Sequence, residues 1–387
     1  MIYFDHGATS FPKPAGMVEA MENCMLRYCG NPGRSGHRMS MKMGEKIYEA
    51  RKQVASLLGI KDASRLIFTK NTTEGLNLAL WGILRNGDHV VTTAMEHNSV
   101  LRPLHQLEKK GVTHTIVPAD LQGKIKVNDI ERAITDKTRL IVMTGASNVT
   151  GAIMPVENVC RMAKEKGILT LIDGAQYVGS LPVRAEQLGI DLLAFPGHKG
   201  LLGPPGTGGL YVSETVIRSL ELTPLLYGGT GTVSKSDLQP LDFPEGYESG
   251  TVNGPGLIGL GYSASMLNRI GMDTIAFHER ELCSLFEEYL RNMDFVTVYG
   301  PKPEEKIGIT LFNLRGISSE EVTERLSREY GIAVRGGFHC APLAHRAIGT
   351  FDDGAVRLSA GPFNTRKEIR YAADAVYRIG KRKESPF

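Results

Sequence analysis

An α/β fold built around a largely parallel sheet is the class that this sequence predicts, on three observations. Between residues 65 and 212, short apolar runs alternate with amphipathic stretches. The apolar runs are continuous, which is typical of strands buried on both faces. Polar clusters follow several of these runs, at the strand ends where ligands bind in parallel sheets.

Six of the apolar runs are predicted as strands and three amphipathic stretches as helices. The strands are Leu66–Thr69, His89–Ala94, Leu140–Thr144, Leu169–Ile172, Leu192–Phe195 and Gly209–Val212. The helices are Thr73–Leu84, Ser99–Lys110 and Val156–Lys166. Strands that alternate with helices in this way indicate βαβ units, and therefore a parallel sheet.

The amino-acid composition changes after this region. Residues Leu225–Pro255 are rich in glycine and proline, which is compatible with a flexible linker. Their aromatic and apolar residues favour an ordered active-site loop instead. Beyond Gly259 a long helical stretch leads into a second pattern of strands and helices, which predicts a smaller α+β domain.

The bulk composition excludes several classes of function. A length of 387 residues corresponds to about two to three domains. The formal charge of +3 does not indicate a nucleic-acid surface. We find neither a secretory signal pattern nor an apolar run near the roughly 20 residues of a membrane helix. The five cysteines lack paired zinc spacing, so we predict a reduced, cytoplasmic protein without a metal site.

Lys199 and Asp173 are the first candidates for chemistry. Lys199 ends the glycine-hinged turn Phe195–Lys199, directly after a predicted strand. Taken alone it is typical of a surface lysine, but its place after a buried strand favours a Schiff-base lysine. Asp173 also follows a strand and is compatible with a paired structural carboxylate. Facing a pyridine nitrogen, it would keep that nitrogen protonated, so that the ring accepts electrons.

Two other polar clusters follow predicted strands. The segment Asn71–Glu74 has the form of a helix capping box. The N–H groups and threonine hydroxyls of such a helix start also hold phosphate, and the two interpretations are compatible. His97 alone is more typical of a core or turn histidine than of a catalytic group. Beside a planar cofactor it would stack on the ring and move protons.

Cys340 is the second reactive group, far downstream in the segment Arg335–Cys340. Most lone cysteines are small apolar packing residues. This one follows two glycines, with His339 adjacent, a setting that favours a reactive thiolate. The reactive and the inert interpretation carry similar weight. A Schiff-base lysine combined with a thiol is what sulfur chemistry on an amino acid requires.

Taken together, these motifs resemble the class V aminotransferase family of fold-type I pyridoxal-phosphate enzymes. Within it, the chain is most similar to the cysteine desulfurase and selenocysteine lyase branch. The resemblance runs from Tyr3–Ala8 to the turn at Asn364 and Thr365. It is carried by the segments Thr72–Gly75, Glu96–Asn98, Asp173–Gln176, Gly197–Lys199 and Arg335–Cys340.

The resemblance implies a fold and a domain division. We expect a large domain, residues 15–258, with a mostly parallel seven-stranded sheet between helices. Residues 1–14 and 259–387 would form the smaller α+β domain that carries the Cys340 loop. The family's active sites are shared between subunits, so the resemblance also implies a homodimer.

The resemblance implies a pyridoxal 5'-phosphate cofactor and assigns residues to it. Lys199 would form the Schiff base and move protons, Asp173 would pair with the pyridine nitrogen, and Gln176 would bind the phenolic oxygen. His97 would stack on the ring. The phosphate would be held by the following residues, the last of them from the other subunit: Thr72, Thr73, His198 and Thr251.

The substrate is L-cysteine or L-selenocysteine by the same resemblance. Arg357 matches the arginine that clamps the substrate carboxylate, a role that suits the planar guanidinium. Taken alone, it is compatible with a paired strand arginine. Asn148 would lie near the same carboxylate and His37 near the substrate pocket.

Three positions depart from the family pattern. Pro196 stands where a serine usually contacts the phosphate, so one hydrogen bond is missing. Gly336 replaces a threonine or serine, and Phe338 a histidine. These changes leave the Schiff-base chemistry intact and bear on substrate and sulfur-acceptor preference.

The expected activity is that of a cysteine desulfurase, which converts L-cysteine to L-alanine. Its sulfur would pass to Cys340 as a persulfide and then to an acceptor protein, serving iron–sulfur cluster assembly, tRNA thiolation or selenium metabolism. The alternatives are a selenocysteine lyase that does not need Cys340, and another class V aminotransferase or lyase. A non-enzymatic scaffold of the same fold is the remaining alternative.

Overall fold

A seven-stranded sheet forms the centre of the protein. The computed structural model describes residues 1–33 and 36–384. The sheet runs in the order β2 (Leu66–Thr69), β8 (Gly208–Val212), β7 (Leu192–Pro196), β6 (Leu169–Asp173), β5 (Thr138–Thr144), β3 (His89–Thr93) and β4 (Thr113–Val117). Strands β7, β6, β5, β3 and β4 are parallel, and β8 is antiparallel to both of its neighbours. The expected mostly parallel, seven-stranded sheet is confirmed.

All six strands predicted from apolar runs are present, with ends shifted by at most two residues. The sequence analysis missed β4, which pairs with β3 alone and lies at the edge of the sheet. Its residues Thr113–Val117 alternate between exposed and partly buried positions over most of the strand. An edge strand lacks the continuous apolar run by which the inner strands were recognised.

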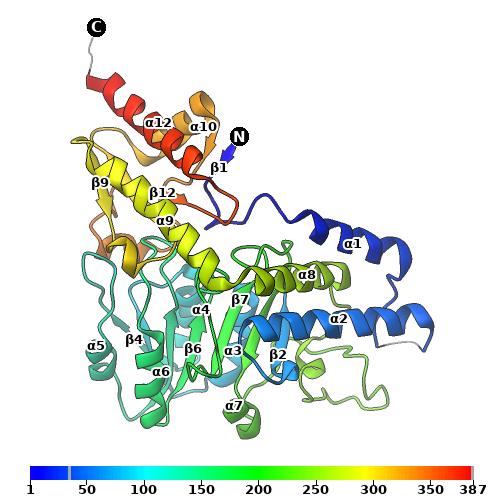
Figure 1. The fold of residues 1–387 in the computed structure, drawn as a ribbon. Helices are drawn as coiled ribbons and strands as arrows, with labels where there is room; N and C mark the ends of the chain where they lie inside the picture. Colours follow the sequence, from blue (N-terminus) through cyan, green and yellow to red (C-terminus); the bar gives the residue numbers. More distant parts are fainter. Residues whose placement is uncertain (34–35, 385–387) are drawn as a thin grey trace.

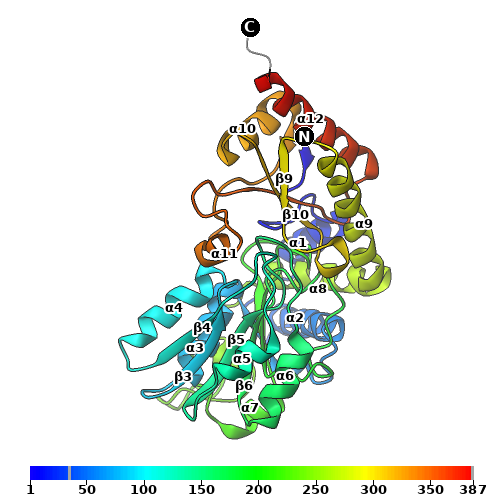
Figure 2. The same ribbon diagram turned by 90° about the vertical axis from the view of Figure 1, so that its left-hand side faces the viewer.

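Helices cover both faces of this sheet (Figures 1 and 2). Leu140 and Val142 of β5 face α3 (Thr72–Ile83) and α4 (Asn98–Glu108), while Ile141 and Met143 face the opposite layer. That layer contains α2 (Arg38–Leu57), α6 (Val156–Glu165) and α8 (Gly254–Ile270). Burial of alternate residues on both faces explains the continuous apolar runs.

Three long helices pack side by side at one flank of the sheet: α1 (Ala15–Arg27), α8 and α2 (Figure 1). The helix expected beyond Gly259 begins earlier, at Gly254. A Cβ atom at Gly261 would lie 2.5 Å from the Cβ of Ala50, so only glycine lets α8 approach α2 this closely. Two short helices complete this part, α5 (Val127–Arg132) and α7 (Glu214–Ser219).

A separate α+β part lies above the sheet in Figure 1. Its three-stranded antiparallel sheet has the order β12 (Val356–Ser359), β10 (Ile309–Leu314) and β9 (Val296–Tyr299). The N-terminal strand β1 (Ile2–Tyr3) pairs in parallel with β11 (Ile332–Ala333). The helices are α9 (Met272–Arg291), α10 (Ser319–Tyr330), α11 (Pro342–Ala347) and α12 (Arg366–Glu384).

Phe4 belongs to the hydrophobic core of this α+β part, so the first residues of the chain pack with the last hundred. The expected boundary between residues 258 and 259 falls inside α8, and the domain division stays a prediction. No helix in the described part of the chain is long and apolar enough to cross a membrane.

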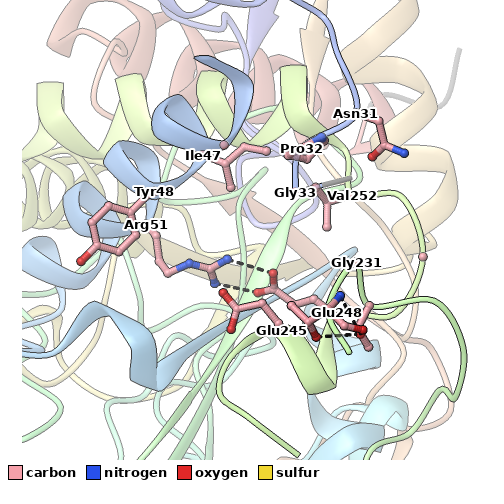
Figure 3. A pocket seen from close by; sticks show the side chains of 14 residues that line it. Asn31, Pro32, Gly33, Ile47, Tyr48, Arg51, Gly231, Glu245, Glu248 and Val252 are labelled. Atoms are coloured by element: carbon pink, nitrogen blue, oxygen red, sulfur yellow. Dashed lines mark hydrogen bonds and ion pairs between the residues drawn. The ribbon is translucent and has the colours of Figure 1, made fainter. Parts of the chain in front are cut away.

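A buried ion pair anchors the end of the glycine-rich segment 225–255. Arg51 of α2 holds both carboxylate oxygens of Glu248, at 2.6 and 2.8 Å (Figure 3). The backbone N–H of Phe68 donates to the same carboxylate at 2.5 Å. Glu248 therefore joins the end of the segment to α2 and β2. The expectation of an ordered active-site loop stays a prediction.

Candidate active site

A cavity opens at the carboxyl ends of the parallel strands, and we call it the strand-end cavity. Thr144, Asp173 and Pro196 are the last residues of β5, β6 and β7, and all three line it. It also collects most of the residues selected from the sequence. Its lining consists of Asn71, Thr72, Thr73, His97, Ser99, Thr144, Asn148, Asp173, Ala175, Gln176, Pro196, His198 and Lys199.

Lys199 reaches the cavity from the turn after β7. The turn is held by hydrogen bonds from Gly197 N to Thr207 O, 2.7 Å, and from Leu202 N to Lys199 O, 2.9 Å. Burial lowers the pKa of the Lys199 amine to about 8, and the charge of Arg357 acts in the same direction. The negative charge of Asp173 opposes both. A lysine with a lowered pKa supplies the neutral amine that a Schiff base requires.

Asp173 ends β6 and is 2% exposed. Burial raises the pKa of its carboxyl group, while a 2.8 Å hydrogen bond from Ala175 N and the charge of Lys199 act against this shift. The neighbouring Gln176 donates from its side-chain amide to Gly7 O at 2.8 Å. A buried carboxylate in this setting is suited to a cationic ring N–H partner.

The start of α3 forms one wall of the cavity. Asn71 caps the helix by accepting from Glu74 N at 2.9 Å, as the capping box predicts. The Glu74 carboxylate reaches back to Lys70 N rather than to Asn71 N. Thr73 Oγ1 lies 2.8 Å from Ser99 Oγ, at the start of α4. The start of α3 thus lies at the cavity with its first N–H groups free of intrahelical partners, which is favourable for a phosphate.

Two histidines of the cavity are neutral at physiological pH. His97 caps α4, and its Nδ1 accepts from Ser99 N at 3.1 Å, which leaves the proton on Nε2. Burial lowers the pKa of His97 to about 4, and the positive charge of Lys199 adds to the effect. Burial likewise lowers the pKa of His198 to about 4, with Lys199 and Lys13 nearby. His198 Nδ1 lies 3.1 Å from Thr9 Oγ1.

Arg357 lies on β12 and is 1% exposed. It donates to Asn148 O and to the Asp5 carboxylate, both at 2.9 Å. Within the described residues, its buried Nε has no hydrogen-bond partner. Gly7 packs against the guanidinium, where a Cβ atom would lie 2.9 Å from Cζ. Asp5 was not predicted from the sequence, because no local pattern marks a residue whose partner lies 352 positions further along the chain.

The Cys340 loop is tied to the edge of the cavity. Asn148 lines the cavity and donates from Nδ2 to His339 O at 2.7 Å. Asn98 N donates to Cys340 O at 2.8 Å. The Cys340 side chain is exposed, and Arg335 Nη2 lies 3.8 Å from its sulfur. The thiol therefore sits on a loop that both the cavity wall and α4 hold in place.

This loop also has a strained backbone. His339 and Cys340 have φ values of 52° and 57°, in the left-handed region that non-glycine residues rarely occupy. Such conformations persist where the surroundings hold them in place, and they cluster at functional sites.

A chain of hydrogen bonds behind the loop was not predicted from the sequence. Arg335 O can only accept, so His339 Nε2, at 3.3 Å, carries a proton. His339 Nδ1 then accepts from His345 Nε2 at 3.2 Å, and His345 Nδ1 accepts from Thr350 Oγ1 at 2.7 Å. Burial lowers the pKa of both imidazoles, that of His345 to about 4. Both rings are neutral, and each has a single tautomer.

Arg357 and Cys340 do not line the strand-end cavity, but Arg357 and the Cys340 loop bond Asn148 of its wall. Two other selected residues lie away from the cavity of this chain. Thr251 is exposed and lines a different pocket, beside Lys70 and Glu74. His37 is exposed and caps α2, with Nδ1 accepting from Ser40 N at 3.3 Å. A place for Thr251 in a partner's site stays a prediction, as does a place for His37 near the substrate.

Comparison with known proteins identifies the family. The Aminotransferase class-V family model matches residues 2–371, so the chain belongs to this family. A probable cysteine desulfurase of Methanothermobacter thermautotrophicus is 36% identical, over 98% of this chain and 94% of the relative. The cysteine desulfurase of Haloferax volcanii is 33% identical, over 97% and 88%.

Solved structures agree with this assignment. The apo structure of a cysteine desulfurase from Thermococcus onnurineus has a TM-score of 0.92 and 34% identity, and it covers 98% of this chain and 94% of the other. The cysteine desulfurase CsdA from Escherichia coli has a TM-score of 0.86 and 28% identity, with coverage of 97% and 94%. The expected fold-type I architecture is thereby confirmed.

Proposed function

We propose that this protein is a pyridoxal 5'-phosphate-dependent cysteine desulfurase, which converts L-cysteine to L-alanine and passes the sulfur to Cys340. One observation carries the proposal. Asn148 lines the strand-end cavity that holds Lys199 and Asp173, and it also bonds the backbone of the Cys340 loop. An amino acid bound over Lys199 would therefore lie close to the Cys340 thiol.

The residues of the cavity fit this cofactor. The start of α3, with Thr72 and Thr73, suits the phosphate, and Asp173 suits a protonated ring nitrogen. Lys199, with its lowered pKa, suits the aldehyde carbon. His97 would lie against the ring. When bound, the cofactor supplies an electron sink for the charge that develops at the substrate α-carbon.

The chain's own residues perform the remaining steps. Arg357 and Asn148 would bind and orient the substrate carboxylate. The Lys199 amine, displaced by the substrate, takes the α-proton and later returns a proton to the product. The fixed loop would position the Cys340 thiolate so that its sulfur attacks the substrate sulfur.

Sulfur transfer is a balanced two-electron step. A bond forms between Cys340 Sγ and the substrate sulfur, and the Cβ–S bond of the substrate breaks. The electron pair of that bond goes to Cβ, which is then protonated to give alanine. Cys340 is thereby oxidised to a persulfide, and an acceptor thiol removes the outer sulfur. The exposure of Cys340 suits a protein acceptor in the cytoplasm.

The test measures alanine release from L-cysteine by cofactor-loaded protein with a thiol reductant. We compare Cys340→Ala with Cys29→Ala, since Cys29 is also a free, exposed cysteine. We expect Cys340→Ala to lose alanine release and the persulfide adduct seen by mass spectrometry, and Cys29→Ala to keep both. Equal release from the two variants would contradict the persulfide mechanism. Selenide release from L-selenocysteine by Cys340→Ala would then favour a selenocysteine lyase.

A further inference from the structure

Three potential metal ligands lie close together where α4 ends and the edge strand β4 begins. Figure 2 shows this helix beside the edge of the sheet. His105 and Glu108 lie in the last turn of α4, three residues apart and thus on one face of the helix. His114 lies on β4. We propose that these three side chains bind a divalent transition-metal ion of the zinc class, at a site separate from the proposed active site.

The spacing of the three side chains suits one metal ion. His105 Nδ1 lies 3.4 Å from Glu108 Oε2, and His114 Nδ1 lies 3.3 Å from Glu108 Oε1. One ligand atom from each residue can be chosen so that all lie within 4.8 Å of one another. Bonds of about 2.0–2.1 Å at tetrahedral angles place ligand atoms roughly 3.3–3.4 Å apart. The two contacts, one to each oxygen of the Glu108 carboxylate, therefore have the length found between ligands of a shared ion. Rotation of the exposed His105 side chain would bring the three ligands around one ion.

His114 supplies a second and independent observation. Its side chain is only 6% exposed, and within the described residues its Nδ1 makes no hydrogen bond. The nitrogen is close to Glu108 Oε1 but is not aligned to donate to it. A buried ring nitrogen without a partner costs free energy. A metal ion that binds both His114 Nδ1 and Glu108 Oε1 would give the nitrogen a partner and would neutralise the carboxylate oxygen.

The ligand types select the class of ion. Two imidazole nitrogens and a carboxylate suit Zn²⁺ and related transition metals, whereas Mg²⁺ and Ca²⁺ prefer oxygen ligands alone. The exposed His105 and Glu108 side chains leave the fourth coordination position to water. No metal site was predicted from the sequence, because the cysteines lack the spacing of zinc ligands and the half-exposed strand β4 carries no apolar run.

The site lies at the far end of α4 from the strand-end cavity. His97 caps the first turn of this helix, and His105 lies eight residues further on, about 12 Å along the axis. Asn98, also in the first turn, donates from its backbone to Cys340 O. A bound ion would therefore link α4 to the edge strand β4. The same helix supports the Cys340 loop.

Titration calorimetry with Zn²⁺ tests the proposal on the full chain carrying Cys29→Ser and Cys340→Ser, because these exposed thiols would also bind zinc. We expect one zinc ion per chain in this background. His105→Ala should lower the affinity more than about 100-fold, since the loss of a supporting contact alone costs roughly 10–100-fold. Glu108→Gln should act in the same direction. Glu324→Gln, which removes an exposed helical carboxylate elsewhere, should change nothing.

Two further readouts decide the interpretation. Zn²⁺ should raise the melting temperature of the background protein and leave that of His105→Ala unchanged, and Mg²⁺ should affect neither. His105 is exposed, so its replacement is not expected to impair folding. Equal zinc affinity in the background and in His105→Ala would overturn the proposal. Equal binding of Mg²⁺ would overturn the assigned class of ion.

Discussion

Asp173 and Glu96 are two buried carboxyl groups at the same edge of the central sheet, and burial raises the pKa of both. Asp173 lines the strand-end cavity together with Lys199, whose positive charge opposes the rise of its pKa. Glu96 is fully buried and accepts from Thr93 Oγ1 at 2.6 Å and from Thr144 N at 3.0 Å. Burial raises the pKa of Glu96 to about 8, and the charge of Asp173 acts in the same direction, which favours the neutral acid in the folded protein at pH 7.

The first prediction concerns Asp173→Asn. An amide cannot stabilise a protonated ring nitrogen, so the cofactor becomes a weaker electron sink. We expect kcat for alanine formation to fall by about 100-fold or more, the range typical of lost acid–base assistance. The cofactor absorbance, recorded in parallel, should remain and shows that the site is intact. Full activity in Asp173→Asn would contradict the role of this carboxylate.

The second prediction concerns Glu96→Gln and the pH dependence of stability. The unfolded chain loses the Glu96 proton near pH 4.5 and the folded protein near pH 8, so the folded state binds more protons between these values. The stability from this group is therefore complete below pH 4.5 and is lost as the pH rises towards 8.

The free energy of unfolding of Glu96→Gln, from urea titrations at several pH values, should lack this decline, whose slope is about 1.4 kcal/mol per pH unit. Glu324→Gln serves as a control for the loss of one carboxyl group elsewhere. If the free energy of unfolding of the wild type and of Glu96→Gln changed with pH in parallel, Glu96 would have an ordinary pKa in the folded protein, and the prediction would be wrong.

At the scale of elements, the Cys340 loop depends on side chains that follow it in the sequence. Thr350 sits after α11 and donates to His345, which donates to His339 beside the thiol. This series of neutral donors and acceptors holds the left-handed backbone of His339 and Cys340. His345 and Thr350 are thus positioning residues for the proposed sulfur transfer.

The third prediction tests this series with two matched variants. Thr350→Val keeps the shape but leaves His345 Nδ1 without a donor, and Thr350→Ser keeps the hydroxyl. We expect Thr350→Val to slow persulfide formation by about 10- to 100-fold, the scale of a small misplacement, with KM and the cofactor spectrum unchanged. Thr350→Ser should retain the wild-type rate. Equal rates in both variants would make Thr350 a packing residue alone.

The fourth prediction concerns the glycine-rich segment 225–255. The side chains of Arg51 and Glu248 are 7% and 8% exposed, so loss of one partner leaves a buried charge. Arg51→Met should lower the free energy of unfolding by about 3–5 kcal/mol. The double variant with Glu248→Gln should lose less, because glutamine is neutral and still accepts from Phe68 N. Chemical denaturation of the two variants measures the difference.

At the scale of the whole molecule, the expected homodimer would place Thr251 in the partner's active site. Thr251 is exposed and does not line the strand-end cavity of its own chain. It lies on the segment that Glu248 anchors. A phosphate-binding role for Thr251 therefore requires a second copy of the chain.

The fifth prediction mixes two variants that we expect to be impaired, Lys199→Ala, which lacks the Schiff-base amine, and Thr251→Val, which lacks a phosphate ligand. A heterodimer of the two has one site with both defects and one site with neither, if Thr251 acts across the interface. We expect alanine formation to reappear when the two variants are unfolded together and refolded as a mixture. Light scattering should show a dimer. No recovery in a verified heterodimer would mean that Thr251 serves its own chain.

The strands and the strand-end cavity were accessible from the sequence alone because their signals are local. A run such as Leu140–Thr144 is continuous in apolar residues since both of its faces are buried, wherever the strand lies in the sheet. The residues after such runs meet at one edge by the geometry of parallel strands. Asp173, His97 and Lys199 were found in this way.

The pairings between distant segments were decided by the tertiary structure. Asp5 meets Arg357, and Arg51 meets Glu248, because packing brings together residues that no sequence period relates. The edge strand β4, which carries His114, was not predicted because a half-exposed strand lacks a continuous apolar run. Local pattern records which face of an element is buried, whereas side-chain partners depend on how the elements pack, and only the folded chain contains that information.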